Sequence, residues 1–237
     1  MSEAAFSLKG NDETFRERRH LHGRRVGRPL KSNQAELLAT RLPALRIDPT
    51  QPPPAQPAAL FPIPVEGVWL EIGFGAGEHL LWQAGEHPEI GLIGCEPFVN
   101  GVAKAVRGVD EAGLRTVRLY DDDARHLLDW LPPASIGRVF VLFPDPWPKK
   151  RHRKRRILTD EGLALLARVM KPGAELRFAT DIADYAEMVV EGIDASAQFE
   201  SESGLLPERP ADWPLTRYAE KAIAAGRACE FFVFRRS

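Results

Sequence analysis

Residues 68–78 decide the fold, and they read Val-Trp-Leu-Glu-Ile-Gly-Phe-Gly-Ala-Gly-Glu. The apolar run at 68–72 predicts a buried strand of the kind found in parallel sheets. Glycines at 73, 75 and 77 then allow a tight turn and the close approach of a ligand to the backbone, and the next helix would present free N–H groups at its start. This order predicts the first unit of an α/β domain with a ligand at the turn.

The alternation of strand and helix continues along the chain. Further strands are expected at 90–95, 116–120, 138–143, 175–179 and 231–234. Helices are expected up to about Glu86, after Phe98, and over 124–131, 163–170 and 185–193, and the helix over 163–170 is expected to end at Lys171-Pro172-Gly173. Such alternation predicts an α/β fold with a mainly parallel sheet and helices on both faces.

The first 64 residues lack the alternation of strand and helix found in the rest of the chain. We therefore divide the chain into segment 1–64 and a domain over 65–237. Residues 1–32 predict an arm that is partly disordered without a partner. Its basic cluster consists of Arg16, Arg18, Arg19, Arg24, Arg25, Arg28 and Lys31. Asn33 is expected to cap a short helix. Seven prolines within 48–64 predict an extended linker or a strapped loop.

Bulk composition restricts the function classes. The 32 Lys and Arg against 33 Asp and Glu leave a net charge of −1, which taken whole argues against a nucleic-acid binder, although the local clustering of cations reverses that argument. Two cysteines and six unpaired histidines predict neither a disulfide framework nor a metal site. The absence of a signal-peptide pattern and of a long apolar run predicts a cytoplasmic protein.

A second stretch, residues 139–156, suggests the chemistry. It reads Val-Phe-Val-Leu-Phe-Pro-Asp-Pro-Trp-Pro-Lys-Lys-Arg-His-Arg-Lys-Arg-Arg. Asp145 lies between two prolines just past an apolar strand, where open α/β sheets place their ligands. The eight residues from Lys149 to Arg156 include seven Lys or Arg and one His. An acid on a stiff turn beside a dense cation patch indicates chemistry on a polyanion.

Acidic residues stand near the ends of four expected strands: Glu71, Glu96, Asp123 and Asp145. Glu96 is placed to hold ribose hydroxyls, and Asp123 with the N–H of Ala124 to read an adenine edge. The dinucleotide fingerprint needs a third glycine where this chain has Glu78, and a carboxylate there would repel a pyrophosphate. The pattern therefore favours S-adenosylmethionine over NAD as the cofactor.

Several motifs together resemble one family. Glu71-Ile-Gly-Phe-Gly-Ala-Gly looks like motif I of the class I methyltransferases. Phe143-Pro-Asp-Pro-Trp-Pro-Lys-Lys-Arg-His looks like the signature of the bacterial tRNA (guanine-N7-)-methyltransferases of the TrmB family, and Thr180-Asp181 and Thr216-Arg217-Tyr218 resemble further motifs of that family. The resemblance implies a Rossmann-like fold with a seven-stranded sheet. It also implies methylation of N7 of the variable-loop guanosine, position 46, of tRNA.

The resemblance also implies roles for individual residues. Those expected to bind S-adenosylmethionine are Glu71, Gly73, Gly75, Gly77, Glu96, Asp123, Ala124 and Asp145, with Asp145 also catalytic. Those expected to contact the target nucleotide are Lys149, Asp181, Thr216, Arg217, Tyr218 and Glu220, where Glu220 would replace an acid that the family carries at the position of Ala219. Those expected to contact RNA are Lys150, Arg151, His152, Arg153, Lys154, Arg155 and Arg156.

The chemistry of guanine shapes the expected mechanism. N7 carries a lone pair and no proton, so methyl transfer needs no base, and we interpret Asp145 as an orienting and electrostatic group. Trp147 either stacks on a base or anchors the turn. Two alternatives stay open: a class I methyltransferase with another substrate, and a non-catalytic RNA-binding module. The oligomeric state is not indicated, and monomer and homodimer remain equally open.

Overall fold

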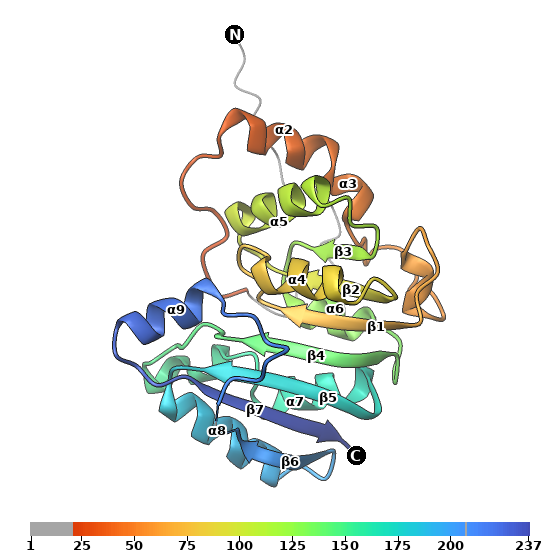
Figure 1. The fold of residues 1–237 in the computed structure, drawn as a ribbon. Coiled ribbons are helices and arrows are strands. Elements are labelled where there is room, and N and C mark those ends of the chain that lie inside the picture. Colours follow the sequence, from red (N-terminus) through yellow and green to blue (C-terminus); the bar gives the residue numbers. More distant parts are fainter. Residues whose placement is uncertain (1–20, 207) are drawn as a thin grey trace.

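The computed structural model describes residues 21–206 and 208–237, and Figure 1 shows its arrangement. Arg16, Arg18 and Arg19 of the predicted arm lie outside these residues. A seven-stranded sheet has the order β3-β2-β1-β4-β5-β7-β6 in the described part of the chain. Its strands are β1 (Gly67–Ile72), β2 (Ile90–Cys95), β3 (Val117–Tyr120), β4 (Ile136–Leu142), β5 (Met170–Thr180), β6 (Phe199–Leu205) and β7 (Glu230–Arg236).

The strand directions confirm the expected α/β fold. Strands β1 to β5 pair in parallel, whereas β7 runs antiparallel to both β5 and β6. Strand β1 lies between β2 and β4, so the connection after β3 crosses to the opposite side of β1. This reversal of strand order leaves a crevice at the carboxyl ends of β1 and β4, the usual ligand position in open α/β sheets.

Helices cover both faces of the sheet (Figure 1). The helices of the described residues are α2 (Ser32–Thr40), α3 (Leu42–Leu45), α4 (Glu78–Glu86), α5 (Val99–Glu111), α6 (Ala124–Trp130), α7 (Asp160–Val169), α8 (Ala183–Asp194) and α9 (Arg217–Ala224), with 3-10 turns η1 (Pro57–Leu60) and η2 (Lys150–Arg155). Helices α4 and α5 pack on one face through Leu80 and Val106. Helices α6, α7 and α8 pack on the other through Leu127, Leu166 and Val189.

Residues 32–64 pack against the domain. Leu38 of α2 and Leu42 of α3 are buried with the apolar residues of α5. The backbone N–H of Ile47 donates to the carbonyl of Leu119 at 2.8 Å, which covers the β3 edge of the sheet. The position of α2 corrects one prediction: Lys31, not Asn33, is the N-cap, and the backbone N–H of Lys31 donates to Oε1 of Gln34 at 3.1 Å.

The proline-rich segment 48–64 is a strapped loop, so of the two predicted forms the linker is wrong. Trp130 Nε1 donates to the carbonyl of Gln51 at 2.7 Å, and Arg118 Nε donates to that of Leu60 at 2.6 Å. Phe61 is buried, and the Arg118 guanidinium lies 5.6 Å from its ring centroid. The segment also forms η1, because a 3-10 turn that begins at proline needs no N–H from it.

Three elements in the second half of the chain differ from the predictions. Strand β5 begins at Met170 rather than at 175, and it includes Pro172 and Gly173 across a break in register. Strand β6 and helix α9 were not predicted at all. Polar residues fill most of β6, an edge strand paired only with β7, so the apolar alternation that signals a strand is weak.

Candidate active site

A cavity of about 480 Å³ lies at the carboxyl ends of the parallel strands, a size typical of sites for small ligands. It brings together much of the predicted cofactor set: Gly73, Gly75, Glu96, Asp123, Ala124 and Asp145. Of the other predicted residues, Arg155, Arg156, Arg217 and Tyr218 also line it. Residues separated by more than a hundred positions in sequence thus share one wall, which indicates a built binding site.

The glycine turn after β1 forms the floor of the cavity. Gly73, Gly75 and Gly77 have φ angles of 79°, 59° and 87°, a region that residues with a Cβ atom rarely adopt. A Cβ atom on Gly101, in the first turn of α5, would lie 2.2 Å from the Gly75 carbonyl oxygen. The helix therefore approaches the loop closely because residue 101 is glycine. Gly77 caps α4 and packs on Ala105 outside the lining of the cavity.

Glu96, which directly follows β2, holds this turn in place through hydrogen bonds. Its two carboxylate oxygens accept from the backbone N–H groups of Gly75 and Phe98, each at 2.9 Å. Burial raises the pKa of Glu96 above its usual value, against the effect of these two hydrogen bonds, and the nearby Asp145 and Glu71 carboxylates raise it further. Each oxygen retains a lone pair, so the side chain is arranged to accept from a vicinal diol such as a ribose.

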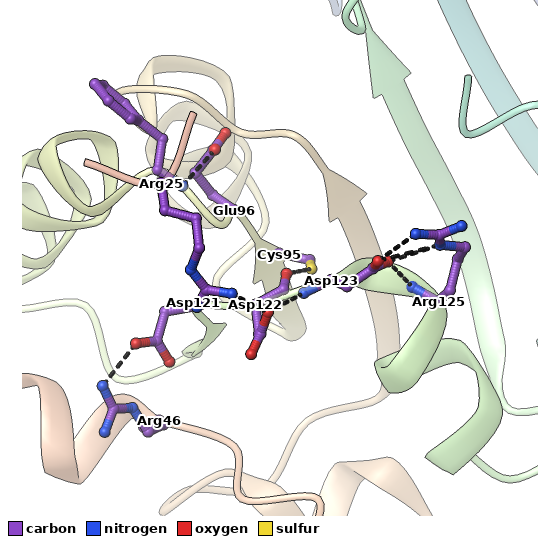
Figure 2. Close-up of polar contacts among 9 residues, drawn as sticks. Arg25, Arg46, Cys95, Glu96, Asp121, Asp122, Asp123 and Arg125 are labelled. Atoms are coloured by element: carbon purple, nitrogen blue, oxygen red, sulfur yellow. Dashed lines mark hydrogen bonds and ion pairs between the residues drawn. The ribbon is translucent and has the colours of Figure 1, made fainter. Parts of the chain in front are cut away.

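Three consecutive aspartates after β3 each pair with an arginine, as Figure 2 shows. The pairs are Arg46 with Asp121, Arg25 with Asp122, and Arg125 with Asp123. Asp123 is also the N-cap of α6, accepting from the backbone N–H of Arg125 at 3.0 Å. These hydrogen bonds hold the pKa of Asp123 below its usual value against the opposing effect of burial. The predicted adenine contact would share this carboxylate with Arg125.

Asp122 is a residue that the sequence reasoning missed. Its Oδ1 accepts from Arg25 Nη1 at 2.7 Å and from the backbone N–H of Asp123 at 2.9 Å. Residues 21–24 line the cavity, and the Arg25 carbonyl accepts from the N–H of Val99 at 2.9 Å. This part of the arm thus follows a defined path along the start of α5. The signal that the sequence offered for Asp122 was the run of three aspartates at 121–123, together with the basic residues of the arm.

Glu71 is placed differently from the prediction. Its side chain is buried, and Oε2 lies 2.8 Å from Nδ1 of His79, which sits in the first turn of α4. His79 in turn lies 3.1 Å from Nε2 of Gln83, which donates to the carbonyl of Asp212. Glu71 is not among the described residues that line the cavity. The carboxylate therefore joins β1 to α4 and, through His79 and Gln83, to the segment before α9.

Asp145 stands on a turn with a strained conformation. Phe143 and Trp147, two residues on either side of it, have φ angles of 51° and 41°. Each left-handed residue with a side chain costs on the order of 1 kcal/mol, so the surrounding structure must hold the turn. The Asp145 carboxylate is exposed at the cavity mouth, and partial desolvation raises its pKa above the usual value.

The basic segment, residues 149–156, follows this turn and forms η2. Lys149, Lys150, Arg151 and Lys154 are exposed, and no ion pair is found for them within residues 21–206 and 208–237. Arg153 pairs with Asp184 at 2.6 Å, and the Arg155 guanidinium lies 5.0 Å from the Trp147 ring centroid. His22 and His152 also approach the edge of this indole. Trp147 is thus packed as an anchor, while one of its sides adjoins the cavity.

Arg156 is the exception in this segment, since its side chain is fully buried. It donates to Asp184 and to the carbonyl of Pro146, so phosphate cannot reach its guanidinium in this structure. This placement argues against the predicted RNA contact of Arg156. The sequence offered no means of separating it from the six other cations, because only packing distinguishes them.

Only two of the residues expected to bind the target nucleotide line the cavity. Arg217 and Tyr218 line the cavity, whereas Lys149, Asp181, Thr216 and Glu220 do not. Asp181 pairs with Arg227 at 2.6 Å, and Thr216 is the N-cap of α9, accepting from the N–H of Ala219. Ala219 is buried against the domain and Glu220 is exposed. An acid at position 219 would therefore point into the protein in this arrangement.

Membrane spans and metal clusters are both missing from the part of the chain that the structure describes. No helix there is long and apolar enough to cross a membrane. No group of three or more His, Cys, Asp or Glu side chains in the same residues is arranged to hold a metal ion.

Comparison with known sequences identifies the relatives of the chain. A family model described as "Putative methyltransferase" matches residues 66–231. A tRNA (guanine-N(7)-)-methyltransferase of Caulobacter vibrioides (strain NA1000 / CB15N) is 54% identical over 203 residues, covering 85% of this chain and 88% of that protein. One of Rhizobium meliloti (strain 1021) is 46% identical over 222 residues, covering 91% and 94%.

Solved structures share the fold at low sequence identity. A mutant of the 16S rRNA (adenine(1408)-N(1))-methyltransferase from Catenulisporales acidiphilia is 19% identical with a TM-score of 0.53, covering 80% of this chain and 92% of that one. TrmN from Thermus thermophilus is 14% identical with a TM-score of 0.53, covering 86% and 48%. These similarities support the expected Rossmann-like methyltransferase fold.

Proposed function

We propose that this chain, which belongs to the tRNA (guanine-N7-)-methyltransferase family, transfers a methyl group from S-adenosylmethionine to N7 of the variable-loop guanosine, position 46, of tRNA. One observation carries the proposal. The cavity that holds Glu96 and Asp123 opens beside the Asp145 turn, and the exposed cations of the basic segment follow that turn directly. A site for a small cofactor and a surface for a polyanion are therefore adjacent.

The residues of the cavity fit the proposed donor. S-adenosylmethionine supplies the methyl group on a sulfonium, together with an adenosine that has a ribose diol and an adenine edge. Glu96 would accept from the ribose, and the turn at Gly73 and Gly75 would lie against the cofactor without a Cβ clash. Asp123 and the backbone of Ala124, which also line the cavity, would contact the adenine. The negative charges on this wall would favour a cationic ligand.

The protein's main contribution to rate is expected to be positioning. Holding two reactants in line at near-attack distance can supply about 7–11 kcal/mol of the barrier. Attack by N7 leaves positive charge on guanine, and the Asp145 carboxylate would stabilise it by accepting from the N1–H and N2–H₂ edge. Asp181 is the second candidate for that edge, and using it would require release from Arg227.

The target base must leave its tertiary contacts in tRNA before it reaches the cavity. Extruding a base costs a few kcal/mol, and phosphate contacts made by Lys149, Lys150, Arg151 and Lys154 would offset part of that cost. Tyr218 is half-exposed and lines the cavity. Its ring lies so close to Gly75 that a Cβ atom at position 75 would be 3.1 Å from it, so the ring would flank the entering base. Action on tRNA also leads us to propose a cytoplasmic location.

Tritiated-methyl transfer from S-adenosylmethionine to transcribed tRNA tests the proposal. Digestion to nucleosides should give labelled N7-methylguanosine, and a transcript with adenosine at position 46 should accept no label. Label at another base or another guanosine would reject the assignment. Cofactor binding without transfer to any tRNA would favour a different substrate or an RNA-binding module.

A further inference from the structure

Arg156 differs from the other cations of the basic segment in being fully buried, although it shares Asp184 as a partner with Arg153. Its side chain is 0% exposed, and its Nη2 donates to both carboxylate oxygens of Asp184 at 3.0 Å. Nη1 donates to the backbone carbonyl of Asp184 at 3.2 Å, and Nε donates to that of Pro146 at 2.9 Å. The guanidinium carbon lies 4.4 Å from the Tyr185 ring centroid. The group is fully occupied by protein partners.

A hydrogen bond to the Pro146 carbonyl fixes the backbone next to Asp145. Pro146 lies between Asp145 and Trp147, and Trp147 has a φ of 41°. At the other end of the turn, Phe143 has a φ of 51°, and its N–H donates to the Ala179 carbonyl of β5 at 2.7 Å. A strained backbone conformation persists only where the surrounding interactions hold it in place. The turn that bears Asp145 is thus fastened to β5 at its start and to Arg156 at its end.

The other partner of Arg156 belongs to the start of α8. Asp184 lies in the first turn of that helix, three residues after Asp181. Its neighbour Tyr185 is buried and accepts from the backbone N–H of Leu158 at 3.3 Å. One guanidinium therefore joins the Asp145 turn, the end of the basic segment and the helix that follows Asp181. The planar fork of arginine is needed for this set, because a lysine ammonium cannot make a bidentate pair and a third bond in the same plane.

We propose that Arg156 is a positioning residue for the methyl transfer, which fixes the Asp145 turn through the Pro146 carbonyl and does not bind RNA. The inference rests on the proposed function. It separates Arg156 from its exposed neighbours, whose expected effect is on RNA affinity. Loss of the guanidinium should therefore misplace Asp145 and lower the rate of the bound complex, while the electrostatic attraction of tRNA persists.

Steady-state methylation of tRNA by Arg156→Lys and Arg156→Ala tests this assignment. We expect kcat to fall at least 10-fold in both variants, with KM for tRNA changed less than about 3-fold and the slope of log K against log[salt] unchanged. Guanidinium ion at millimolar concentration should restore part of the kcat of Arg156→Ala and leave Asp145→Ala unaffected. Arg151→Ala should instead raise KM and lower the salt slope, and Arg115→Ala controls for removal of an exposed arginine.

A variant of Asp184, the ion-pair partner of Arg156, keeps the proposal testable if Arg156→Ala does not fold. Asp184→Asn retains the size of the side chain and weakens the bidentate pair together with the Arg153 pair, so kcat should fall in the same direction as in Arg156→Lys. Unchanged kcat in folded Arg156→Lys and Asp184→Asn, or a salt slope reduced by about one in Arg156→Lys, would overturn the inference and leave the proposed function standing. A wild-type chain that forms no N7-methylguanosine would overturn both.

Discussion

The acids of the cavity wall and the cations of the basic segment are held in opposite ways. Glu96 and Asp123 of this wall are buried, as is the neighbouring Asp122, and each accepts hydrogen bonds from backbone or arginine donors. Lys150, Arg151 and Lys154 are exposed and unpaired within the described residues. The first group has the fixed geometry that the proposed cofactor site requires, and the second has the exposure that the proposed contact with a long polyanion requires.

Asp145 and Arg156 stand between these two regions and share features of both. Asp145 has an exposed carboxylate on a rigid backbone, and Arg156 is a cation of the basic segment that is buried like the acids. The contrast teaches that charge type alone does not assign a role here. The proposed division into residues that orient the reactants and residues that attract RNA rests on burial and hydrogen-bond partners.

The largest effect is expected at the junction of the two regions. Asp145→Ala should lower kcat about 100-fold, the loss typical when one group that stabilises transition-state charge is removed. The affinity for tRNA should change little, since the cations beyond the turn remain. Single-turnover methylation of tRNA at saturating enzyme measures the effect. An unchanged single-turnover rate would remove Asp145 from the mechanism.

A smaller loss is expected at the cavity wall. Glu96→Ala removes the acceptor for the N–H groups of Gly75 and Phe98 as well as the predicted ribose contact. Two hydrogen bonds with a net contribution of about 1.3 kcal/mol each correspond to S-adenosylmethionine binding weaker by about 80-fold. Titration calorimetry measures it, with Glu111→Ala on the exposed side of α5 as the matched control. Equal affinity of the wild type and Glu96→Ala for S-adenosylmethionine would contradict the assignment of Glu96 to the cofactor site.

Acid should weaken cofactor binding through the same residue. Burial raises the pKa of Glu96, so its carboxylate takes up a proton at a higher pH than an ordinary glutamate does. Affinity for S-adenosylmethionine should therefore be full at neutral pH and decline as pH falls through that raised pKa, by up to about 10-fold per pH unit. Calorimetry between about pH 7 and pH 4, with folding monitored by circular dichroism, tests the prediction. A flat profile in folded protein would count against it.

The basic segment should respond chiefly to salt. Arg151→Ala with Lys154→Ala removes two exposed cations and spares Arg153, which is paired with Asp184. Affinity for tRNA should fall about 10-fold, and the slope of log K against log[salt] should lose roughly 0.7–0.9 for each phosphate contact removed. Cofactor binding should stay as in wild type. Fluorescence anisotropy at several salt concentrations measures the slope, and an unaltered slope would remove these cations from the RNA surface.

The smallest effect is expected at Glu220. Its side chain is exposed on α9 and does not reach the lining of the cavity among the described residues. Glu220→Ala should change turnover by less than about 3-fold, since surface substitutions without specific partners alter free energies only slightly. Comparison with Asp145→Ala in one methylation assay decides the question. A loss as large as that of Asp145→Ala would show that Glu220 replaces the family acid absent at Ala219.

The regular part of the fold could be predicted because its signals are local. Buried parallel strands such as β2 are apolar throughout, and the glycines of the turn after β1 require backbone angles that few other residues adopt. Strand β6 escaped prediction because a polar edge strand carries little apolar periodicity. Helix α9 escaped it because the helix has only eight residues and its buried residues, Ala219 and Ala222, are small. Lys171-Pro172-Gly173 looked like a stop and instead forms an irregular start of β5.

Sequence by itself determined the order of elements and the residue types that chemistry needs at their ends, because strand periodicity, glycine angles and charge runs are properties of neighbouring residues. Only the tertiary structure decided which of those charges remain available. It paired Glu71 with His79, Asp123 with Arg125 and Arg156 with Asp184, and it left Asp145 and Arg151 exposed. The physical reason is that burial and hydrogen-bond partners come from segments distant in sequence, which meet only when the sheet and its helices pack.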